Sequence, residues 1–457
     1  MPGQESSGRF AQSLQKKVSS IYSPEQLEKL AKQTGFQERK GKLTPGMFVD
    51  TVVFKDLHGG SVSLNDHSVA LLGEYGVDIK KQSLAERFDD KAVEFIRRLL
   101  ERQLSSQMNS IISKKLLSDK LGHFTSIKVK DSTRFQIPAE LKAYYPGNTG
   151  AASGAGVHIQ FEFDLLGGKV HDLAVTHALR QDNTDAQETI DAIEPGSLII
   201  RDLGYFSKDV LQQIDTKGGY FITRAQAGMN LYNAHTDEKL DFNCIYRKMK
   251  RNKLSILEIP VLSGNKLAMR LVVEVLPKEQ VNRRLAKAEK EARKKGRHLT
   301  DEYKSRARLN LFLTNVPADW IPTHQVRETY QLRWQIELRF KAWKSFYNLH
   351  RIKKMQRHRF ECYLYGTLLL LIINWEIAVN FFTILWEYTG KPLSVLKFYK
   401  ATSQKTYQLK LAILEGGDKL IDYIKILYQV SYSKLLSEKR KGHIGSLQEI
   451  LMATTKV

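Results

Sequence analysis

Between residues 124 and 225 the hydrophobic pattern switches repeatedly between the strand period and the helix period, and this feature constrains the fold most. Period-two stretches at 125–131, 157–164 and 169–178 predict three consecutive strands. The stretches that follow predict, in order, a helix at 183–193, a strand at 196–202, a helix at 208–216 and a strand at 218–225. The order β-β-β-α-β-α-β predicts an α/β fold in which helices connect parallel strands.

Two of the predicted strands end in an aspartate. "TSIKVKDS" alternates apolar residues with lysines up to Asp131, as expected for a half-buried strand, and "GSLIIRD" ends at Asp202. Parallel strands joined by helices bring their carboxyl ends to one rim of the sheet, where α/β folds usually carry their chemistry. We therefore expect Asp131 and Asp202 to lie near each other. The alternative is that each is an ordinary turn residue or helix cap.

Short cap signals predict where several helices begin. Ser23-Pro24 and Thr44-Pro45 each place a capping hydroxyl before a proline at the first helical position. Three further caps are predicted for helices that follow Ser83 (with Glu86), Asn183 or Thr184, and Ser207. The first 120 residues or so therefore read as a helical region.

The charge of the chain restricts its partners. The 457 residues include 71 lysines and arginines against 49 aspartates and glutamates, a formal net charge of +22. A chain of this length suggests two to four structural units. A basic excess this large favours a polyanionic partner, most often nucleic acid. The alternative is a basic surface that only keeps the protein soluble.

The cysteines and the apolar runs argue against other classes of protein. Cys244 and Cys362 lie far apart and form no CxxC pair, which disfavours a disulfide framework or a zinc site and fits a reducing cytoplasm. The first ten residues lack the apolar stretch of a signal peptide. The most apolar run, 362–375, is too short to span a bilayer, so we expect a buried core helix there and no membrane association.

A single carboxylate, Glu337, lies in the strongly cationic stretch 329–359. If residues 329–345 form one helix at about 100° per residue, four polar residues share about 60° of arc, namely Tyr330, Arg333, Glu337 and Lys344. The face beside this stripe is apolar. The ordinary explanation of Glu337 is an ion pair with a cation four residues away, Arg333 or Lys341.

The combination of Asp131, Asp202 and Glu337 predicts a metal site. Carboxylate oxygens are the ligands that Mg²⁺ prefers. Two such ions about 4 Å apart activate an attacking oxygen and stabilise a leaving oxygen in phosphoryl transfer. The neighbouring Arg333 and Lys344 would then hold a negatively charged backbone in line. The residues themselves thus predict phosphoryl transfer on nucleic acid.

The spacing Y-x2-R-x3-E-x6-K, met here by Tyr330, Arg333, Glu337 and Lys344, resembles the YREK signature of bacterial insertion-sequence DDE transposases, the cut-and-paste group. This match is specific because four spaced residues coincide. The resemblance extends over roughly residues 40–385.

Two shorter motifs support the same resemblance. "KVKDST" is similar to the first aspartate motif of that family and gives Asp131. "IIRDLGYF" is similar to the second and gives Asp202, with Gly204 and Tyr205 in their usual places. Each motif is weak alone, but both stand in the expected order and position.

The resemblance implies a ribonuclease H-like catalytic core with a β-rich insertion before the Glu-bearing helix, flanked by helical N- and C-terminal regions. The expected division is a helical N-terminal DNA-binding region at 1–120, the first part of the core at 121–225, the insertion at 226–320, the core with the Glu-bearing helix at 321–385, and a helical C-terminal region at 386–457. Basic helices of the N-terminal region are expected to recognise the element ends.

The resemblance also implies roles for the site residues. The implied ligands of two Mg²⁺ ions, for which Mn²⁺ can substitute, are Asp131, Asp202 and Glu337. The implied contacts to phosphates at the element's end are Tyr330, Arg333 and Lys344, with Trp334 packed near the DNA end. A base-holding role for Trp320 stays open, since a tryptophan that anchors a domain junction is the more ordinary interpretation.

The implied reaction is hydrolysis of a phosphodiester at the element ends, followed by transesterification, in which the freed 3′-OH attacks target DNA. The implied partners are double-stranded DNA, as element ends and as target, and a second copy of the chain in a homodimeric end-paired complex. Two alternatives remain. One is a sequence-specific DNA-binding protein that has lost catalysis, and the other is a repair or recombination nuclease on the same fold.

Overall fold

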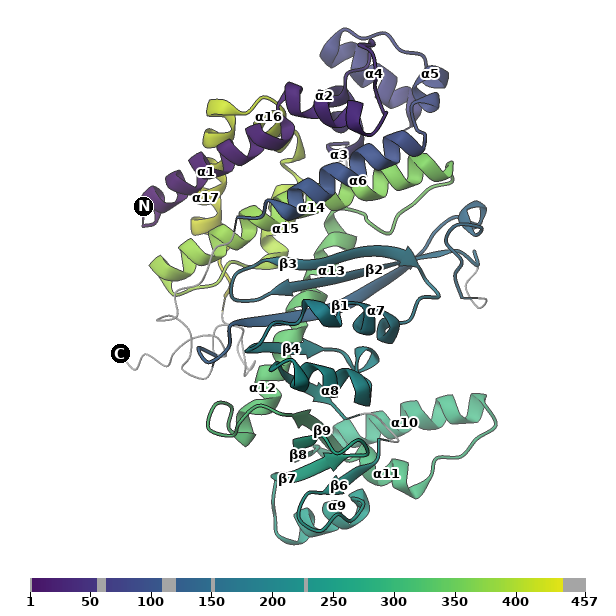
Figure 1. Cartoon of the computed structure of the whole chain (residues 1–457), viewed down its shortest axis with the longest axis vertical. Coiled ribbons are helices and arrows are strands. Elements are labelled where there is room, and N and C mark those ends of the chain that lie inside the picture. The colour runs from purple at the N-terminus through teal and green to yellow at the C-terminus, as the bar shows by residue number, and fades with distance from the viewer. Residues whose placement is uncertain (1, 56–62, 109–120, 149–152, 226–228, 439–457) are drawn as a thin grey trace.

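One mixed sheet of nine strands runs through the part of the chain that the computed structural model describes, residues 2–55, 63–108, 121–148, 153–225 and 229–438. The strands, in order across the sheet, are β3 (Val170–His177), β2 (Gly156–Asp164), β1 (Ser126–Gln136), β4 (Ser197–Arg201), β5 (Tyr220–Arg224), β9 (Leu309–Thr314), β8 (Ala268–Val275), β7 (Ile256–Ser263) and β6 (Leu231–Asn233). Helices from both ends of the chain gather beyond the β3 edge (Figure 1). The fold is mixed α/β with many helices, as predicted.

The centre of the sheet has the predicted order of elements. β1, β4 and β5 are parallel, and α7 (Asp182–Glu188) and α8 (Lys208–Thr216) connect into β4 and β5. β2 pairs antiparallel with both β1 and β3. The β-β-β-α-β-α-β pattern is therefore confirmed between residues 126 and 224.

The expectation of a half-buried first strand is wrong. Lys128 and Lys130 of β1 are 1% and 0% exposed, and every residue of β2 is buried. Helices cover both faces of these strands. Phe161 packs against Trp343 of α13 (Trp334–Phe346) on one face, and Lys130 pairs with Asp185 of α7 on the other. The alternating pattern here separates two covered faces, not core from solvent.

The segment 226–320, predicted to be β-rich, contributes β6 to β9, and these strands continue the central sheet. β9 pairs antiparallel with both β5 and β8. β7 and β8 form the predicted hairpin, which turns at Gly264 and Asn265. The charge-rich stretch between β8 and β9 is helical, as expected. The helices of this segment are α9 (Phe242–Arg251), α10 (Lys278–Lys294) and α11 (Asp301–Ala307).

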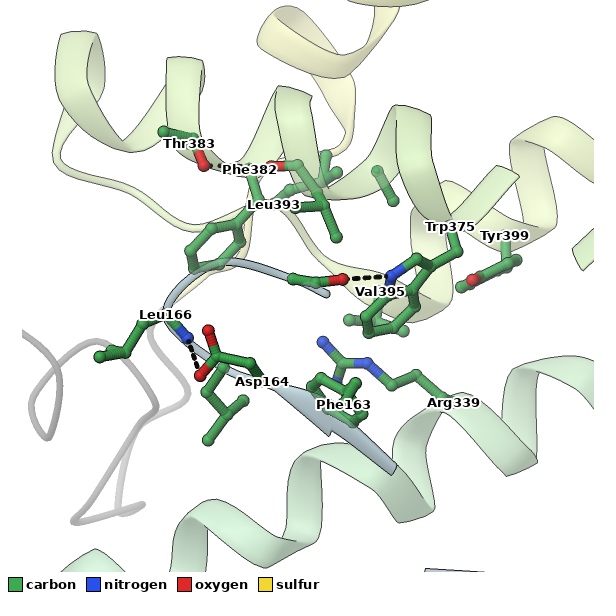
Figure 2. Close-up of a pocket in the computed structure, with 14 residues that line it drawn as sticks. Phe163, Asp164, Leu166, Arg339, Trp375, Phe382, Thr383, Leu393, Val395 and Tyr399 are labelled. Carbon is green, nitrogen blue, oxygen red and sulfur yellow. Dashed lines mark hydrogen bonds between the residues drawn. The ribbon is translucent and has the colours of Figure 1, made fainter. Parts of the chain in front are cut away.

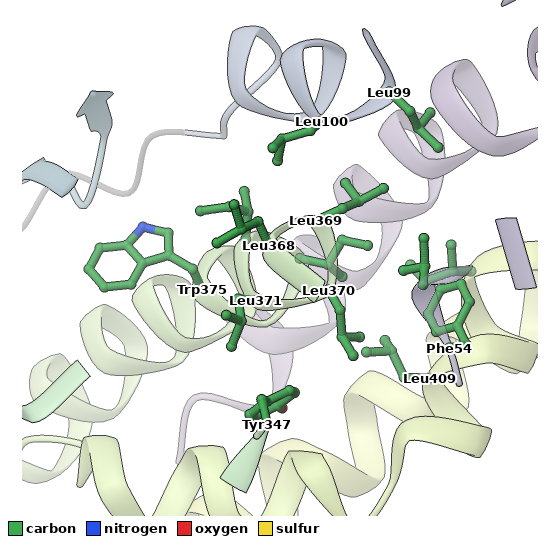
Figure 3. Close-up of a cluster of buried hydrophobic side chains, with 14 of the residues drawn as sticks. Phe54, Leu99, Leu100, Tyr347, Leu368, Leu369, Leu370, Leu371, Trp375 and Leu409 are labelled. Carbon is green, nitrogen blue, oxygen red and sulfur yellow. The ribbon is translucent and has the colours of Figure 1, made fainter. Parts of the chain in front are cut away.

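Helices from the two ends of the chain share one hydrophobic core around α14 (Arg357–Thr389). The helices that surround α14 are α1 (Gln4–Tyr22), α2 (Pro24–Gln33), α3 (Pro45–Val53), α4 (Leu64–Tyr75), α5 (Lys81–Glu86), α6 (Asp90–Ser105), α15 (Val395–Ser403), α16 (Thr406–Leu414) and α17 (Gly417–Lys434). Leucines 368–371 of α14 lie among Leu99 and Leu100 of α6 and Leu409 of α16 (Figure 3). Parts of the two predicted helical regions, 109–120 and 439–457, lie outside the described residues.

α14 is the one helix in the described part of the chain that is long and apolar enough to cross a membrane. Inside the structure, 78% of its most apolar window is buried. Glu376, within this helix, pairs with Lys17 and accepts a hydrogen bond from Gln103 at 2.8 Å. The run at 362–375 is therefore the buried core helix that the sequence predicts.

Three of the predicted helix caps are confirmed. The side-chain oxygens of Ser23, Thr44 and Ser207 each accept a hydrogen bond from the backbone N–H of the third residue of the helix that follows, α2, α3 and α8 respectively. Each residue has an extended backbone and precedes its helix directly, which is the geometry that satisfies an otherwise unpaired donor.

Two predicted caps are wrong. Ser83 lies inside the short helix α5, and α6 begins only at Asp90, where the Asp89 carboxylate accepts from the backbone N–H of Ala92. α7 begins at Asp182, so Asn183 and Thr184 lie within its first turn. Capping residues recur every few positions in both stretches, and local sequence alone does not decide which of them begins the helix.

A small cavity of about 50 Å³ lies between the β2–β3 turn and helices α13, α14 and α15 (Figure 2). The Arg339 guanidinium lies between two rings there, 4.7 Å from the Phe163 centroid and 5.0 Å from the Trp375 centroid. Burial lowers the pKa of Arg339 to about 10. Because the two ring faces attract the cation, Arg339 holds α13 against both β2 and α14.

Candidate active site

Two adjacent parallel strands position the two aspartates. Lys130 of β1 pairs in register with Arg201 of β4, so Asp131 and Asp202 follow a directly matched pair. Asp202 leaves β4 as predicted and precedes the 3₁₀ turn η4 (Leu203–Tyr205), without a capping hydrogen bond from its side chain. The prediction that Asp131 ends its strand is wrong, because β1 runs on to Gln136 in its pairing with β2.

Residues 329–345 are not the single helix that the stripe assumed. They comprise the end of α12 (Val326–Tyr330), the 3₁₀ turn η6 (Gln331–Arg333) and most of α13. A 3₁₀ turn advances about 120° per residue instead of 100°, so three residues add about 60° of rotation. Tyr330 is consequently turned into the core, 8% exposed, with its ring 5.4 Å from that of Phe312.

Arg333 joins the catalytic candidates from different segments. Its Nη1 lies 2.9 Å from Asp131 Oδ2, and its Nη2 lies 2.5 Å from Glu337 Oε1. The Asp131 and Arg333 side chains are each 17% exposed, and that of Glu337 is 34% exposed. The ordinary ion pair between Glu337 and the arginine four residues earlier is therefore present, and the same guanidinium extends it to β1.

Electrostatics place all three carboxylates at one site. Burial, together with the charges of Asp202 and Glu337, raises the pKa of Asp131 to about 6, although the Ser132 amide and Arg333 oppose the rise. A nearby like charge disfavours the ionised form of a carboxyl group. The structure thus brings the predicted trio of Asp131, Asp202 and Glu337 within electrostatic reach of one another.

The arrangement of the side chains is not that of a closed metal site. In the residues that the structure describes, no group of three or more His, Cys, Asp or Glu side chains is placed to hold a metal ion. The donor chemistry nevertheless suits a hard divalent cation, because the trio offers only carboxylate oxygens. Arg333 lies between two of them and supplies the positive charge that balances them.

The other predicted site residues differ in exposure. Trp334 is 56% exposed. Lys344 lies near the end of α13, where its Nζ donates to the backbone oxygen of Arg134 at 3.3 Å, and burial lowers its pKa. Burial raises the pKa of Tyr330 to about 12, so its hydroxyl is neutral at physiological pH. These residues line up along α12 to α13, and only Tyr330 is withdrawn from the surface.

Trp320 packs at a junction of three segments. Its ring is stacked on His123 at 4.7 Å, and it contacts Phe124 and Tyr220 at 5.8 and 5.0 Å between centroids. These neighbours precede β1 and begin β5, respectively. The position agrees with the interpretation of Trp320 as an anchor between structural units.

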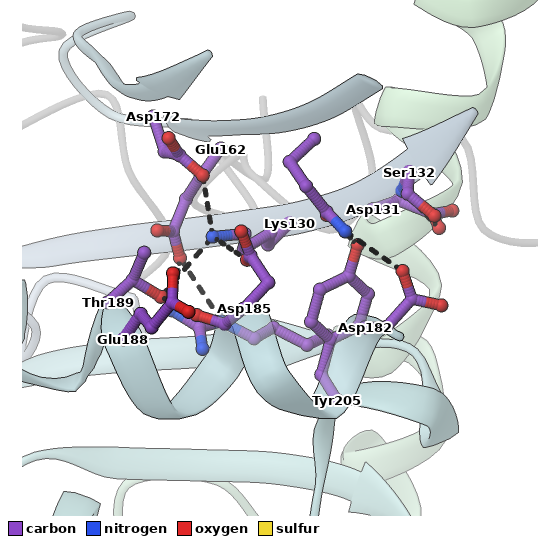
Figure 4. Close-up of polar contacts among 12 residues, drawn as sticks. Lys130, Asp131, Ser132, Glu162, Asp172, Asp182, Asp185, Glu188, Thr189 and Tyr205 are labelled. Atoms are coloured by element: carbon purple, nitrogen blue, oxygen red, sulfur yellow. Dashed lines mark hydrogen bonds and ion pairs between the residues drawn. The ribbon is translucent and has the colours of Figure 1, made fainter. Parts of the chain in front are cut away.

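Sequence reasoning missed a layer of paired charges on the opposite face of β1 and β2 (Figure 4). The Lys130 Nζ lies 2.7 Å from Asp172 Oδ2 and 2.5 Å from Asp185 Oδ2. Arg201 Nη2 lies 2.8 Å from Glu162 Oε1, and both side chains are at most 2% exposed. Burial alone would raise the pKa of Glu162, but the charges of Arg201 and Lys130 lower it to about 2. Polar residues repeated at alternate positions of both strands were the signal for this layer.

A hydrogen-bonded chain in the same layer reaches the segments that carry the aspartates. The Tyr205 hydroxyl donates to Gln160 Oε1, and Gln160 Nε2 donates to Asp182 Oδ1 at 3.0 Å. Tyr205 stands three residues after Asp202, and Gln160 of β2 lies opposite the residue that follows Asp131. The hydrogen bonds therefore tie β2, the neighbour of β1, to the turn after β4 from behind the site.

Comparisons with known proteins identify the family. A family model described as "Transposase DDE domain" matches residues 122–374. The transposase for insertion sequence element IS231F of Bacillus thuringiensis subsp. israelensis is 32% identical over 414 residues, which cover 86% of this chain and 85% of the relative. The transposase for IS1151 of Clostridium perfringens is 28% identical over 423 residues, 88% of each chain.

A solved structure is also similar in outline. It is a cryo-EM structure of piggyBac transposase in a synaptic complex with hairpin DNA, with a TM-score of 0.44 and 10% identity over 95% of this chain and 86% of that one. This likeness is too weak to carry an argument, and the assignment rests on sequence. The family model spans more than half of the chain and the relatives are matched over most of their length, so the protein belongs to the DDE transposases.

Proposed function

We propose that this protein is an insertion-sequence transposase of the YREK group that cuts DNA at its element's ends by Mg²⁺-dependent hydrolysis and joins the freed 3′-OH ends to target DNA. The observation that carries the proposal is the convergence of Asp131, Asp202 and Glu337 on one cationic site, although they come from β1, the end of β4 and α13. The relatives named for insertion sequences support the same substrate.

The three carboxylates are the proposed ligands of two Mg²⁺ ions, with Mn²⁺ as a substitute. They would become available to cations when Arg333 exchanges its contacts with Asp131 and Glu337 for phosphate oxygens of DNA. Bound ions of this kind activate the attacking oxygen and stabilise charge on the leaving oxygen. No covalent link between protein and DNA is needed, so the mechanism requires no serine, tyrosine or cysteine nucleophile.

The cationic and aromatic residues of α12 to α13 would bind and orient the DNA. Arg333 presents a planar fork of donors that suits a phosphate as well as a carboxylate. Lys344 adds a second positive charge near the other end of α13. The exposed ring of Trp334 would pack near the DNA end. The Tyr330 hydroxyl is buried in this structure, so its proposed phosphate contact would require the side chain to turn outward when DNA binds.

The proposed architecture follows from the same family. A ribonuclease H-like core would comprise residues 121–225 and 321–385, with 226–320 as the insertion. Helices of the region 1–120 would recognise the element ends, and a second copy of the chain would complete the end-paired complex. The described part of the C-terminal region, 386–438, packs with the N-terminal helices around α14, and the region 386–457 would support that assembly.

Glu337→Gln tests the assignment of the site. The substitution keeps the side-chain shape but removes a charged metal ligand, so cleavage of a duplex that carries the element's end should be abolished while binding of that duplex stays within a few-fold. The exposed Glu387→Gln on α14 is the matched control and should cleave normally. Near wild-type cleavage by Glu337→Gln would show that the metal-ligand assignment is wrong.

Two assays separate the proposal from its alternatives. A DNA-binding protein without catalysis would bind the end-bearing duplex and leave it intact in the presence of Mg²⁺ or Mn²⁺. A repair or recombination nuclease would cut without joining the 3′-OH to a second duplex. The expected result for this chain is both cleavage and strand transfer.

A further inference from the structure

A groove of about 480 Å³ lies away from the carboxylates, between the helices α4 and α5 and the start of α14. Its walls come from three parts of the chain, namely the region of α4 and α5, the 3₁₀ turn η2 (Ala139–Leu141) with the residues after it, and the segment that precedes α14. The lining residues used below are Glu140, Tyr144, Lys354, Arg357 and Arg359. We refer to it as the basic groove.

The basic groove has an excess of positive charge. Three of its lining residues are cations, Lys354, Arg357 and Arg359, and one is a carboxylate, Glu140. Arg351 and Lys353 are exposed beside it, and within the described residues no ion pair is recorded for either. This charge is complementary to a polyanion.

The cation at the mouth of the groove is free to change partners. Lys354 pairs with Glu140 at 2.5 Å, but their side chains are 77% and 46% exposed. An exposed pair of this kind contributes little to stability and is screened by salt. A phosphate could therefore replace the Glu140 carboxylate at Lys354 without a large cost to the fold.

Arg357 and Tyr144 form a fixed platform on the wall. The guanidinium of Arg357 lies 4.6 Å from the centroid of the Tyr144 ring, and its Nε donates to Glu361 at 3.0 Å. Asp90 adds a longer contact, 3.8 Å from Arg357 Nη2. Tyr144 itself is 54% exposed. An exposed aromatic ring beside an arginine is a surface on which sugars or bases of nucleic acid can pack.

Two of the three walls of the groove follow directly in the chain from elements that carry the catalytic candidates. The chain leaves β1, the strand of Asp131, and reaches Tyr144 after eight residues. It leaves α13, the helix of Glu337 and Lys344, and reaches Lys354 after another eight. Figure 1 shows the chain passing from α13 to the start of α14 near the α4–α5 end of the molecule. The groove thus lies between the site and the helices proposed to recognise the element ends.

We infer that the basic groove holds the sugar–phosphate backbone of the duplex DNA that flanks the cut site, with Lys353 and Lys354 as phosphate contacts and Tyr144 packed against the sugar or base edge. This inference rests on the proposed function and deepens it, because it assigns a second DNA-contact surface outside the signature residues. An acidic protein segment is the competing occupant and is tested in the same experiment.

The test is the salt dependence of binding by the full-length double variant Lys353→Ala/Lys354→Ala. Affinity for an end-bearing duplex is measured by fluorescence anisotropy over a series of salt concentrations. Each lost phosphate contact removes about 0.9 from the slope of log K against log salt concentration, so the slope should flatten by about two. The matched control is Lys419→Ala/Lys425→Ala on α17, which removes two lysines that are 56% and 53% exposed and should leave the slope unchanged.

A second pair of variants tests the platform. Tyr144→Phe keeps the ring and should bind the duplex like the wild type, whereas Tyr144→Ala should weaken binding several-fold with little change in the salt slope. Melting temperatures close to that of the wild type, expected for substitutions at exposed positions, show that each variant is folded.

The outcomes separate the two proposals. If the wild type binds end-bearing duplex but both lysine variants give the same slope and affinity, the groove is not a DNA surface, and the proposed function is untouched. If the wild type binds no duplex DNA, the proposed function itself fails. If the groove variants lose binding to an acidic peptide but not to DNA, the occupant is a protein segment and the inference is overturned.

Discussion

Buried charges on the two faces of β1 and β2 are paired in different ways. On the face covered by α7, Lys130 has two carboxylate partners and Glu162 pairs with Arg201. On the face covered by α13, Asp131 and Glu337 share one arginine, Arg333, and burial together with the neighbouring carboxylates raises the pKa of Asp131 to about 6. Successive residues of the same strand thus belong to a layer in which each of these charges has a close partner of opposite sign and to one in which three carboxylates gather near a single cation.

The difference indicates which charges serve the fold and which serve the reaction. A buried pair with close partners on both sides fixes the register of its elements, and breaking it leaves an uncompensated charge. Carboxylates gathered around a single cation repel one another, and such perturbed groups cluster at functional sites. The comparison predicts that substitutions on the α7 face reduce stability, whereas substitutions on the α13 face reduce activity.

The largest expected effect is on activity, for Asp131→Asn. Removal of this ligand should lower the rate of cleavage at least about 1000-fold, a loss of about 4 kcal/mol of transition-state stabilisation. The melting temperature near pH 7 should stay the same or rise. The folded-state pKa of Asp131 is raised, so its contribution to stability is present below about pH 4 and is lost as the pH rises through about 6. At neutral pH a neutral asparagine therefore removes an unfavourable charge.

Cleavage rates with end-bearing duplex and thermal unfolding of the same sample check this prediction together. A variant that loses activity only because it has lost its fold would contradict the assignment of Asp131 to the functional face.

The corresponding effect on the α7 face is on stability, for Glu162→Gln. Arg201, with a side chain that is 1% exposed, would remain buried without its carboxylate, and the free energy of unfolding should fall by about 3–5 kcal/mol. Urea denaturation measures it. The control is Glu188→Gln, whose pair with Arg180 is partly exposed and should cost less than about 1 kcal/mol. Equal losses for the two variants would remove the distinction between the faces.

The sequence predicted the elements better than it predicted what covers them. The period-two pattern of β1 predicted the strand correctly, and the three candidate carboxylates were chosen because each follows a local signal. The same pattern could not show that Lys130 is buried, because its partners come from β3 and α7, 42 and 55 positions along the chain. The hydrophobic period of a strand shows that its two faces differ, whereas tertiary packing determines which elements cover each face.

The stripe on the Glu-bearing helix shows a second limit. Helical spacing correctly placed Arg333 beside Glu337, since that contact spans four residues. It did not show the 3₁₀ turn at 331–333, which turns Tyr330 into the core, nor the contact of Arg333 with Asp131 across 202 positions. Helical geometry determines the Arg333–Glu337 contact, whereas tertiary packing brings Asp131 to the same arginine.

A smaller effect is expected on the pH dependence of metal binding. A cation at the site needs Asp131 ionised, so protonation competes with binding. Because the pKa of Asp131 is raised to about 6, the affinity of the free protein for Mn²⁺ should weaken by about tenfold, or ~1.4 kcal/mol, for each pH unit below about 6 and level off above it. Titration of Mn²⁺ by calorimetry or electron paramagnetic resonance between about pH 5 and 7.5 measures this. The inflection should be absent in Asp131→Asn, and its persistence there would assign it to another group.

The smallest effect is expected for Lys344→Ala, and it tests whether the cations of the α13 face serve DNA or the fold. The Lys344 Nζ has a single backbone contact, to Arg134 at 3.3 Å, so its loss should change the free energy of unfolding by less than about 1 kcal/mol. If it contacts one phosphate, the slope of log K against log salt concentration should flatten by about 0.9, with end binding weakened. Lys425→Ala on α17 is the control, because its side chain is 53% exposed and lies outside the α12 to α13 stretch. Equal slopes for the two variants would show that Lys344 contacts no phosphate. The charged groups of the α13 face that serve the reaction would then be the three carboxylates and Arg333.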